Sequence, residues 1–205
     1  MKKTLSLLLT LVMLLAGCGA LAENAGVILE DPYCGITLTV DAEHANLGIE
    51  IQALLDSETN RLICAVMSLN EEALAPLEGE LSAAINANDE DRLYEVLVEV
   101  MKHMPTIANV TMVAQEDYDA ALAEGKTAAD LVADETAEVL GENAGYTYIL
   151  SYPVVDLTDE GLSEAEIAQY EAAIAYLPEL MKTVEFSEPQ EIDGGYETAL
   201  PSGAL

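Results

Sequence analysis

Apolar and polar residues alternate along residues 34–40, the pattern of a strand with one buried face. The same alternation recurs over 47–55, and residues 61–69 are predicted to form a third strand. The polar segment 56–60 between the last two strands is typical of a turn. We therefore expect an antiparallel hairpin within this region, so that residues 34–69 form part of a sheet.

Helical patterns are common in the rest of the chain, and the clearest is the apolar stripe of residues 90–104, which Pro105 ends. Further helices are expected over 70–85 (bent or broken by Pro76 and Gly79), 115–125, 127–140 and 163–182. Further strands are expected over 107–114, 145–155 and 183–187. Because strands and helices do not alternate steadily, the order predicts an α+β fold, mainly an antiparallel sheet with packed helices.

The N-terminal segment has the pattern of an export signal. Two lysines precede an apolar run over residues 5–16, shorter than the roughly 20 residues that a membrane-spanning helix needs. Residues 15–18 read Leu-Ala-Gly-Cys, which resembles the bacterial lipobox. The resemblance implies cleavage before Cys18, a lipid on its sulfur, and anchoring to the outer face of the cell membrane. The alternative is plain secretion after cleavage behind Ala22.

These patterns divide the chain into four parts. Residues 1–17 are the expected signal peptide, and 18–31 a lipidated tether. Residues 32–188 are expected to form a single α+β domain. Residues 189–205 contain several prolines and glycines and are expected to be a flexible tail or linker.

The chain is strongly acidic, with 38 Asp and Glu against 7 Lys and Arg, a formal charge of −31. Removal of residues 1–17 takes away two lysines, which leaves 5 basic and 38 acidic residues and a charge of about −33. Nucleic acid is excluded as a partner because its binding depends on neutralising phosphates. The expected partners are the membrane, through the lipid, and a protein or small solute. The 51% hydrophobic content predicts a folded core.

Two cysteines remain beyond Cys18, and no Cys-x-x-Cys pair is present. If Leu55 pairs with Leu62 in the hairpin, Cys64 lies on the inward face, as does Cys34 on its own strand. A Cys34–Cys64 disulfide is then geometrically allowed if the first strand neighbours the third. The alternative is two buried thiols acting as small apolar side chains.

No other group of residues forms a recognisable catalytic or metal-binding motif. Asp41 and His44 offer two local ligands without a partner set, and an exposed turn histidine explains them. His103 lies near a helix end, where a structural role suffices. Residues 156–161 resemble a calcium loop but fail its spacing. We therefore predict no cofactor, no metal ligand and no catalytic residue.

Two segments suggest a family. Residues 35–39 (Gly-Ile-Thr-Leu-Thr) follow the lipobox, and 161–164 (Gly-Leu-Ser-Glu) lead a long helix into 180–186. Together they resemble the accessory region before the redoxin domain in thioredoxin-like lipoproteins of anaerobic bacteria. They are also similar, more loosely, to PsbP/Mog1-type lipoprotein domains. The resemblance covers residues 32–190 and implies an accessory domain. The redoxin domain and its Cys-x-x-Cys are not in this chain, so no thioredoxin activity carries over.

The sequence thus favours an exported, surface-anchored lipoprotein whose non-catalytic domain binds a partner protein or small solute. One alternative is an accessory module of a thioredoxin-like (redoxin) redox system outside the cytoplasm. The other is an unrecognised hydrolase, which would need a pocket with convergent acids.

Overall fold

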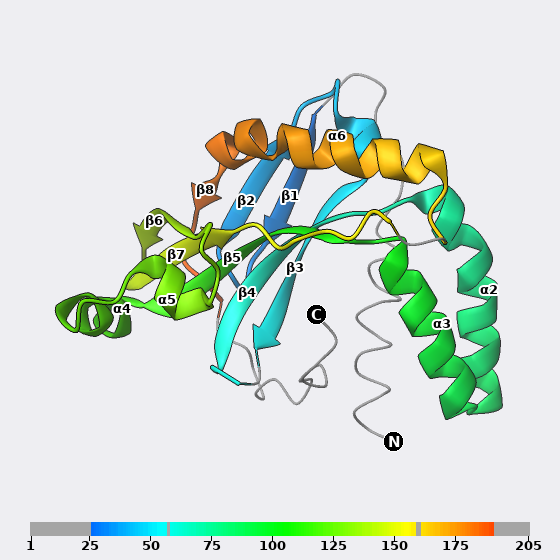
Figure 1. Ribbon diagram of the computed structural model, residues 1–205, viewed down its shortest axis with the longest axis horizontal. Helices are drawn as coiled ribbons and strands as arrows, with labels where there is room; N and C mark the ends of the chain where they lie inside the picture. Colours follow the sequence, from blue (N-terminus) through cyan, green and yellow to red (C-terminus); the bar gives the residue numbers. More distant parts are fainter. Residues whose placement is uncertain (1–25, 57, 159–160, 191–205) are drawn as a thin grey trace.

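Two antiparallel sheets form the centre of the protein in the computed structural model, which describes residues 26–190 except 57, 159 and 160 (Figure 1). The small sheet has the order β1-β2-β8 and the large one β3-β4-β5-β7-β6. The strands are β1 (Val27–Asp31), β2 (Ile36–Val40), β3 (Ile49–Asp56), β4 (Arg61–Ser68), β5 (Thr106–Ala114), β6 (Glu138–Asn143), β7 (Tyr146–Ser151) and β8 (Glu185–Phe186). The helices are α2 (Glu71–Ala87), α3 (Glu90–Lys102), α4 (Gln115–Ala123), α5 (Ala128–Val132) and α6 (Glu164–Leu180), with short 3-10 turns η1 (Ala45–Leu47) and η2 (Met181–Thr183). The predicted α+β class is confirmed.

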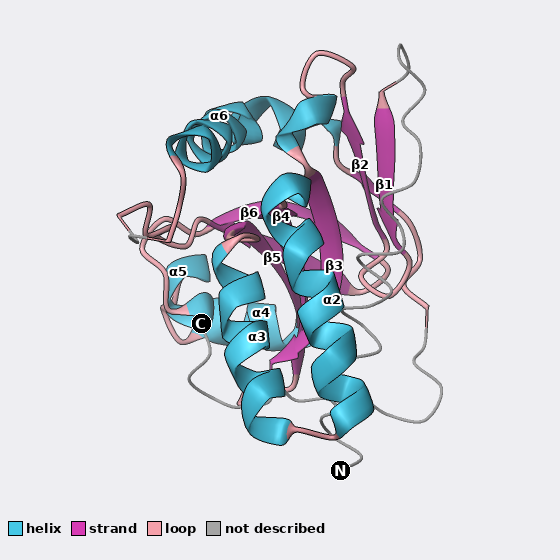
Figure 2. Cartoon of the chain, turned by 90° about the vertical axis from the view of Figure 1, so that its right-hand side faces the viewer, coloured by secondary structure: helices cyan, strands magenta, loops and turns pink. Residues whose placement is uncertain are grey.

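The large sheet is covered on both faces. The helical hairpin of α2 and α3 packs on one face, and α6 with the small sheet lies on the other (Figures 1 and 2). This arrangement explains why Cys64, Ala65, Val66 and Met67, consecutive in β4, are all buried. Alternate residues of that strand enter two separate apolar cores. Within the described residues, no helix has the length and apolar character needed to cross a membrane.

The predicted hairpin is present, with the register that the cysteine argument assumed. Leu55 pairs with Leu62, and Ala53 pairs with Cys64. The Asp56 carboxylate accepts a backbone hydrogen bond from Glu58 at 2.9 Å and so stabilises the turn.

Helix α2 is continuous from Glu71 to Ala87, so of the bend or break expected from Pro76 and Gly79, the break does not occur. Pro76 lies near the helix start, so its missing N–H removes only one early hydrogen bond. Asn70 caps the helix, its side chain accepting from the Ala73 backbone at 2.9 Å. The helix ends at Asn88 in the left-handed conformation, and α3 follows directly.

Two other expectations are wrong in part. The predicted tether over residues 18–31 contains β1, whose five residues pair with β2 from Val27 to Asp31 and bury Leu29. The predicted helix over 127–140 ends at Val132, and the chain instead enters β6.

The pairing of β6 with β7 explains the second error. Ala144 and Gly145 both have positive φ, 49° and 83°, and join the two strands in a tight hairpin. Backbone pairing along β7 therefore outweighs the helical tendency of the segment before it.

Candidate functional site

Asp31 ends β1 and organises the turn into β2. Its Oδ1 accepts hydrogen bonds from the backbone N–H groups of Tyr33 at 3.0 Å and Cys34 at 2.8 Å. The turn closes through Gly35, which has a φ of +62°. A Cβ atom there would lie 2.4 Å from the Ser187 carbonyl oxygen, so the position requires glycine. Asp31 itself is only 6% exposed.

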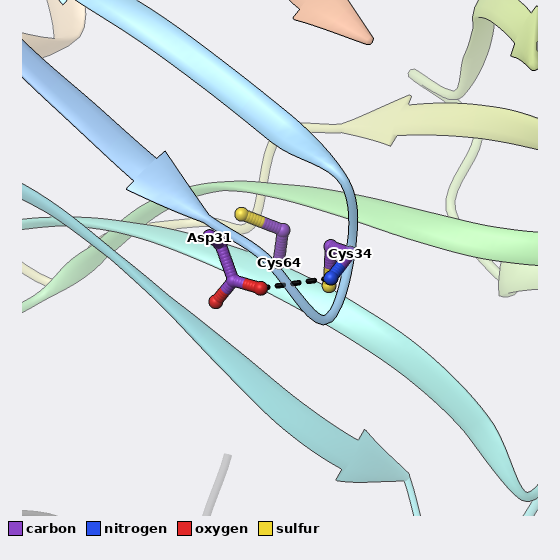
Figure 3. A group of neighbouring side chains, drawn as sticks. All are labelled: Asp31, Cys34 and Cys64. Atoms are coloured by element: carbon purple, nitrogen blue, oxygen red, sulfur yellow. Dashed lines mark hydrogen bonds between the residues drawn. The ribbon is translucent and has the colours of Figure 1, made fainter. Parts of the chain in front are cut away.

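Cys34 and Cys64 meet beside this carboxylate, although they come from different sheets (Figure 3). The two sulfur atoms and one carboxylate oxygen of Asp31 all lie within 4.8 Å of one another. Both cysteines are 0% exposed, and both are free thiols. The two cysteines meet because the small sheet and β4 of the large sheet share one apolar core, not because the first and third strands pair within one sheet.

The surroundings of Cys34 keep its thiol protonated. Its pKa is raised well above the ordinary value, first by the hydrogen bond with the Cys64 side chain and then by burial. Negative charge on Cys64 or Asp31 acts in the same direction. Since the thiolate is the reactive form, this buried thiol is unsuited to nucleophilic or exchange chemistry with a large partner.

Tyr148 of β7 secures the turn from the other sheet. Its hydroxyl donates to the Cys34 carbonyl oxygen at 3.0 Å. Burial raises the pKa of this tyrosine to about 12. Its ring packs against Phe186 with centroids 4.4 Å apart, which supports a core role for this strand tyrosine.

His103 and Glu166 form a second buried polar group. His103 Nδ1 lies 2.5 Å from Glu166 Oε1, joining the end of α3 to the start of α6. Ser163 donates to the other carboxylate oxygen through its backbone at 2.9 Å and its hydroxyl at 2.7 Å. Burial alone would raise the pKa of Glu166, but the hydrogen bonds from Ser163 and His103 more than offset it and lower that pKa. The nearby Tyr170 hydroxyl is buried without a hydrogen-bond partner among the described residues.

His44 and Asp41 form a local contact at the surface, as the turn interpretation predicts. His44 Nδ1 lies 2.8 Å from Asp41 Oδ1, and the imidazole stacks on the Tyr176 ring with centroids 3.9 Å apart. Of the residues described, these two belong to no group with a third metal ligand. Their contacts are explained by packing of η1 against α6.

The outer face of α3 carries an apolar stripe that is exposed in the part of the chain that the structure describes. Tyr94, Val98 and Met101 are 68%, 40% and 45% exposed and follow one another at helical spacing. Of the apolar stripe predicted for this helix, Leu93, Val96, Val100 and Met104 are buried and Met101 is exposed, whereas Tyr94 and Val98 lie outside that prediction.

Acidic side chains lie beside the N-terminal part of this surface. Glu90 and Asp91 lie in the first turn of α3 and are exposed. The basic Arg92 is paired with Glu80 and, at 2.9 Å, with Glu95. We call this apolar surface the α3 stripe (Tyr94, Val98 and Met101). Acidic side chains lie beside its N-terminal part, and the basic Lys102, 3.1 Å from Glu99, lies at its C-terminal end.

Comparison with known proteins finds no matching family model, no similar curated protein and no similar solved structure. The lipobox and Cys18 lie outside the described residues. The acidic loop 156–161 lies partly outside them. In its described part, the Asp156 carboxylate accepts hydrogen bonds from the backbone N–H and the hydroxyl of Thr158.

Sequence reasoning placed Cys34 and Cys64 on inward faces but missed Asp31. The sequence did contain a signal for this contact. Asp31 precedes Cys34 by three residues with Pro32 between them, and an aspartate at this spacing often caps a turn. The approach of Cys64 has no local signal, because it depends on how the two sheets stack.

Proposed function

We propose that this protein is exported, held at the outer face of a bacterial membrane by a lipid on Cys18, and binds a partner protein without catalysing a reaction. The observation that carries the binding proposal is the α3 stripe. Tyrosine and methionine are enriched at the centres of protein interfaces, where aromatic side chains supply much of the binding energy. Contiguous exposed apolar side chains with a polar rim are typical of interaction surfaces.

The charges beside the α3 stripe indicate what kind of surface the partner protein presents. Glu90, Asp91 and Glu95 are exposed beside it, whereas Arg92 is already paired within the protein. A matching surface presents apolar side chains flanked by lysine or arginine. Such an interaction associates more slowly at high salt, because screening removes the long-range attraction.

Anchoring is tested by fractionation of cells that express the chain or its Cys18→Ala variant. The wild-type chain is expected in the membrane fraction, and the variant in the soluble extracytoplasmic or culture fraction. An unchanged membrane fraction for the variant would contradict lipid anchoring.

Binding is tested in the native host with a photo-crosslinking amino acid placed at Tyr94 or Met101 of the full chain. A discrete crosslinked protein is expected from these sites, reduced by Val98→Asp and by high salt. Leu122 on α4, which is 48% exposed, is the matched control site. Equal crosslinking from Leu122, or none from α3, would refute the α3 stripe as the binding surface.

A further inference from the structure

We propose that Asp31, Cys34 and Cys64 form a zinc-binding site that joins the two sheets. Two thiolate sulfurs and one carboxylate oxygen around a tetrahedral zinc ion would lie about 3.5–4 Å from one another, given bond lengths near 2.0–2.3 Å. The three ligand atoms already lie within 4.8 Å of one another, so only small side-chain movements are needed.

The buried charge of Asp31 is the observation that favours a cation. None of the ion pairs between described residues includes Asp31. The residue is 6% exposed. Its Oδ1 accepts hydrogen bonds from two neutral backbone N–H groups, and the neutral Cys34 thiol is a further hydrogen-bond partner of the carboxylate. Buried charges in proteins are typically paired or bound to a metal, because desolvation is otherwise costly. A disulfide between Cys34 and Cys64 would leave this negative charge without a cation.

The ligand set selects among metals. Two sulfur ligands are too soft for calcium or magnesium, which prefer oxygen. The carboxylate oxygen favours zinc over copper(I), which prefers sulfur alone. Binding exchanges the two thiol protons for one Zn²⁺ ion, and both protons pass to the solvent. The backbone N–H groups of Tyr33 and Cys34 hold the carboxylate in place, as hydrogen bonds to metal ligands do elsewhere.

The site connects distant parts of the chain. Asp31 is the last residue of β1, Cys34 lies in the β1–β2 turn of the small sheet, and Cys64 belongs to β4 of the large sheet (Figure 3). A bound ion therefore stabilises the packing of one sheet on the other.

The test uses the full chain carrying Cys18→Ala, purified with a phosphine reductant and stripped with a chelator. Added zinc is expected to remain bound at one ion per chain after gel filtration and to raise the unfolding temperature. Cobalt is expected to bind with a sulfur-to-cobalt charge-transfer absorption. Affinity is measured by competition with a chromophoric zinc chelator.

Asp31→Asn is the decisive variant, because an asparagine oxygen still accepts the two backbone hydrogen bonds. It is expected to weaken zinc binding about tenfold or more, by analogy with the loss of groups that support metal ligands. Asp41→Asn is the matched control, since Asp41 Oδ1 accepts the same pattern of bonds from Glu43 and His44, each at 3.0 Å. Cys64→Ser is expected to abolish the charge-transfer absorption.

Three results would overturn the proposal. The first is no retained zinc in the reduced, folded chain, with folding checked by circular dichroism. The second is equal zinc affinity for Asp31→Asn and Asp41→Asn. The third is a Cys34–Cys64 disulfide in protein isolated from its host without reductant, seen as the loss of two hydrogens in the intact mass and no thiol alkylation after unfolding.

Discussion

The imidazole of His103 at the end of α3 contacts the carboxylate of Glu166 in the first turn of α6, with Nδ1 and Oε1 2.5 Å apart. Both side chains are buried. They come from two helices that cover opposite faces of the large sheet (Figure 1). Glu166 also forms the capping box of α6 with Ser163, so one carboxylate starts a helix and attaches it to another.

Loss of one partner of this pair is expected to destabilise the fold. His103→Ala leaves the buried Glu166 carboxylate without its imidazole partner, at an expected cost of about 3 kcal/mol in the free energy of unfolding. Urea unfolding measures this cost. The control is His44→Ala, because His44 also contacts a carboxylate but at the surface, where such pairs contribute about 0–1 kcal/mol. Equal losses for the two variants would show that burial of the His103 pair has no energetic consequence.

The same pair predicts a dependence of stability on pH. The pKa of Glu166 is lowered from 4.5, so its contribution is complete above the unfolded pKa and is lost as pH falls through the folded pKa. Wild type is expected to lose more stability than Glu166→Gln as pH falls below about 4.5. The measurement is urea unfolding of both proteins across that acidic range, and parallel curves would contradict the lowered pKa.

Two glycines are expected to respond to alanine in opposite directions. Gly35→Ala places a Cβ 2.4 Å from the Ser187 carbonyl oxygen at a φ of +62°, so it is expected to destabilise by about 2 kcal/mol or more. Gly79 lies within α2, and a Cβ added there would meet no atom within 4 Å beyond the helix's own backbone. Gly79→Ala is therefore expected to stabilise by about 0.5–1 kcal/mol. Thermal unfolding of both variants checks the signs, and the same sign for both would refute this account.

Substitutions on the two faces of α3 separate folding from binding. Leu93→Ala removes a buried side chain and is expected to cost about 2–5 kcal/mol. Val98→Ala, on the α3 stripe, is expected to change stability by less than about 0.5–1 kcal/mol, because Val98 is 40% exposed. Chemical unfolding of the two variants tests this difference. A large loss for Val98→Ala would mean that the α3 stripe is part of the core rather than a free surface.

Patterns that act over a few residues were readable in the chain itself. The alternation over 47–55 and the pattern of 61–69 predict two strands joined by a polar turn, and the structure has them as β3 and β4 with Leu55 paired to Leu62. The start of the helix predicted over 163–182 is local too, because Ser163 and Glu166 form the capping box at the start of α6. These features depend on side-chain direction and local hydrogen bonds, which neighbouring residues determine.

Long-range pairing decided the features that the sequence did not reveal. Val27–Asp31 becomes β1 because β2 offers it a partner, and Glu138–Asn143 becomes β6 because β7 does. The candidate zinc site also depends on contacts between distant parts of the chain. The chain places Asp31 near Cys34 through a turn, but only the stacking of two sheets brings Cys64 to them, because no local pattern records which faces meet across a core.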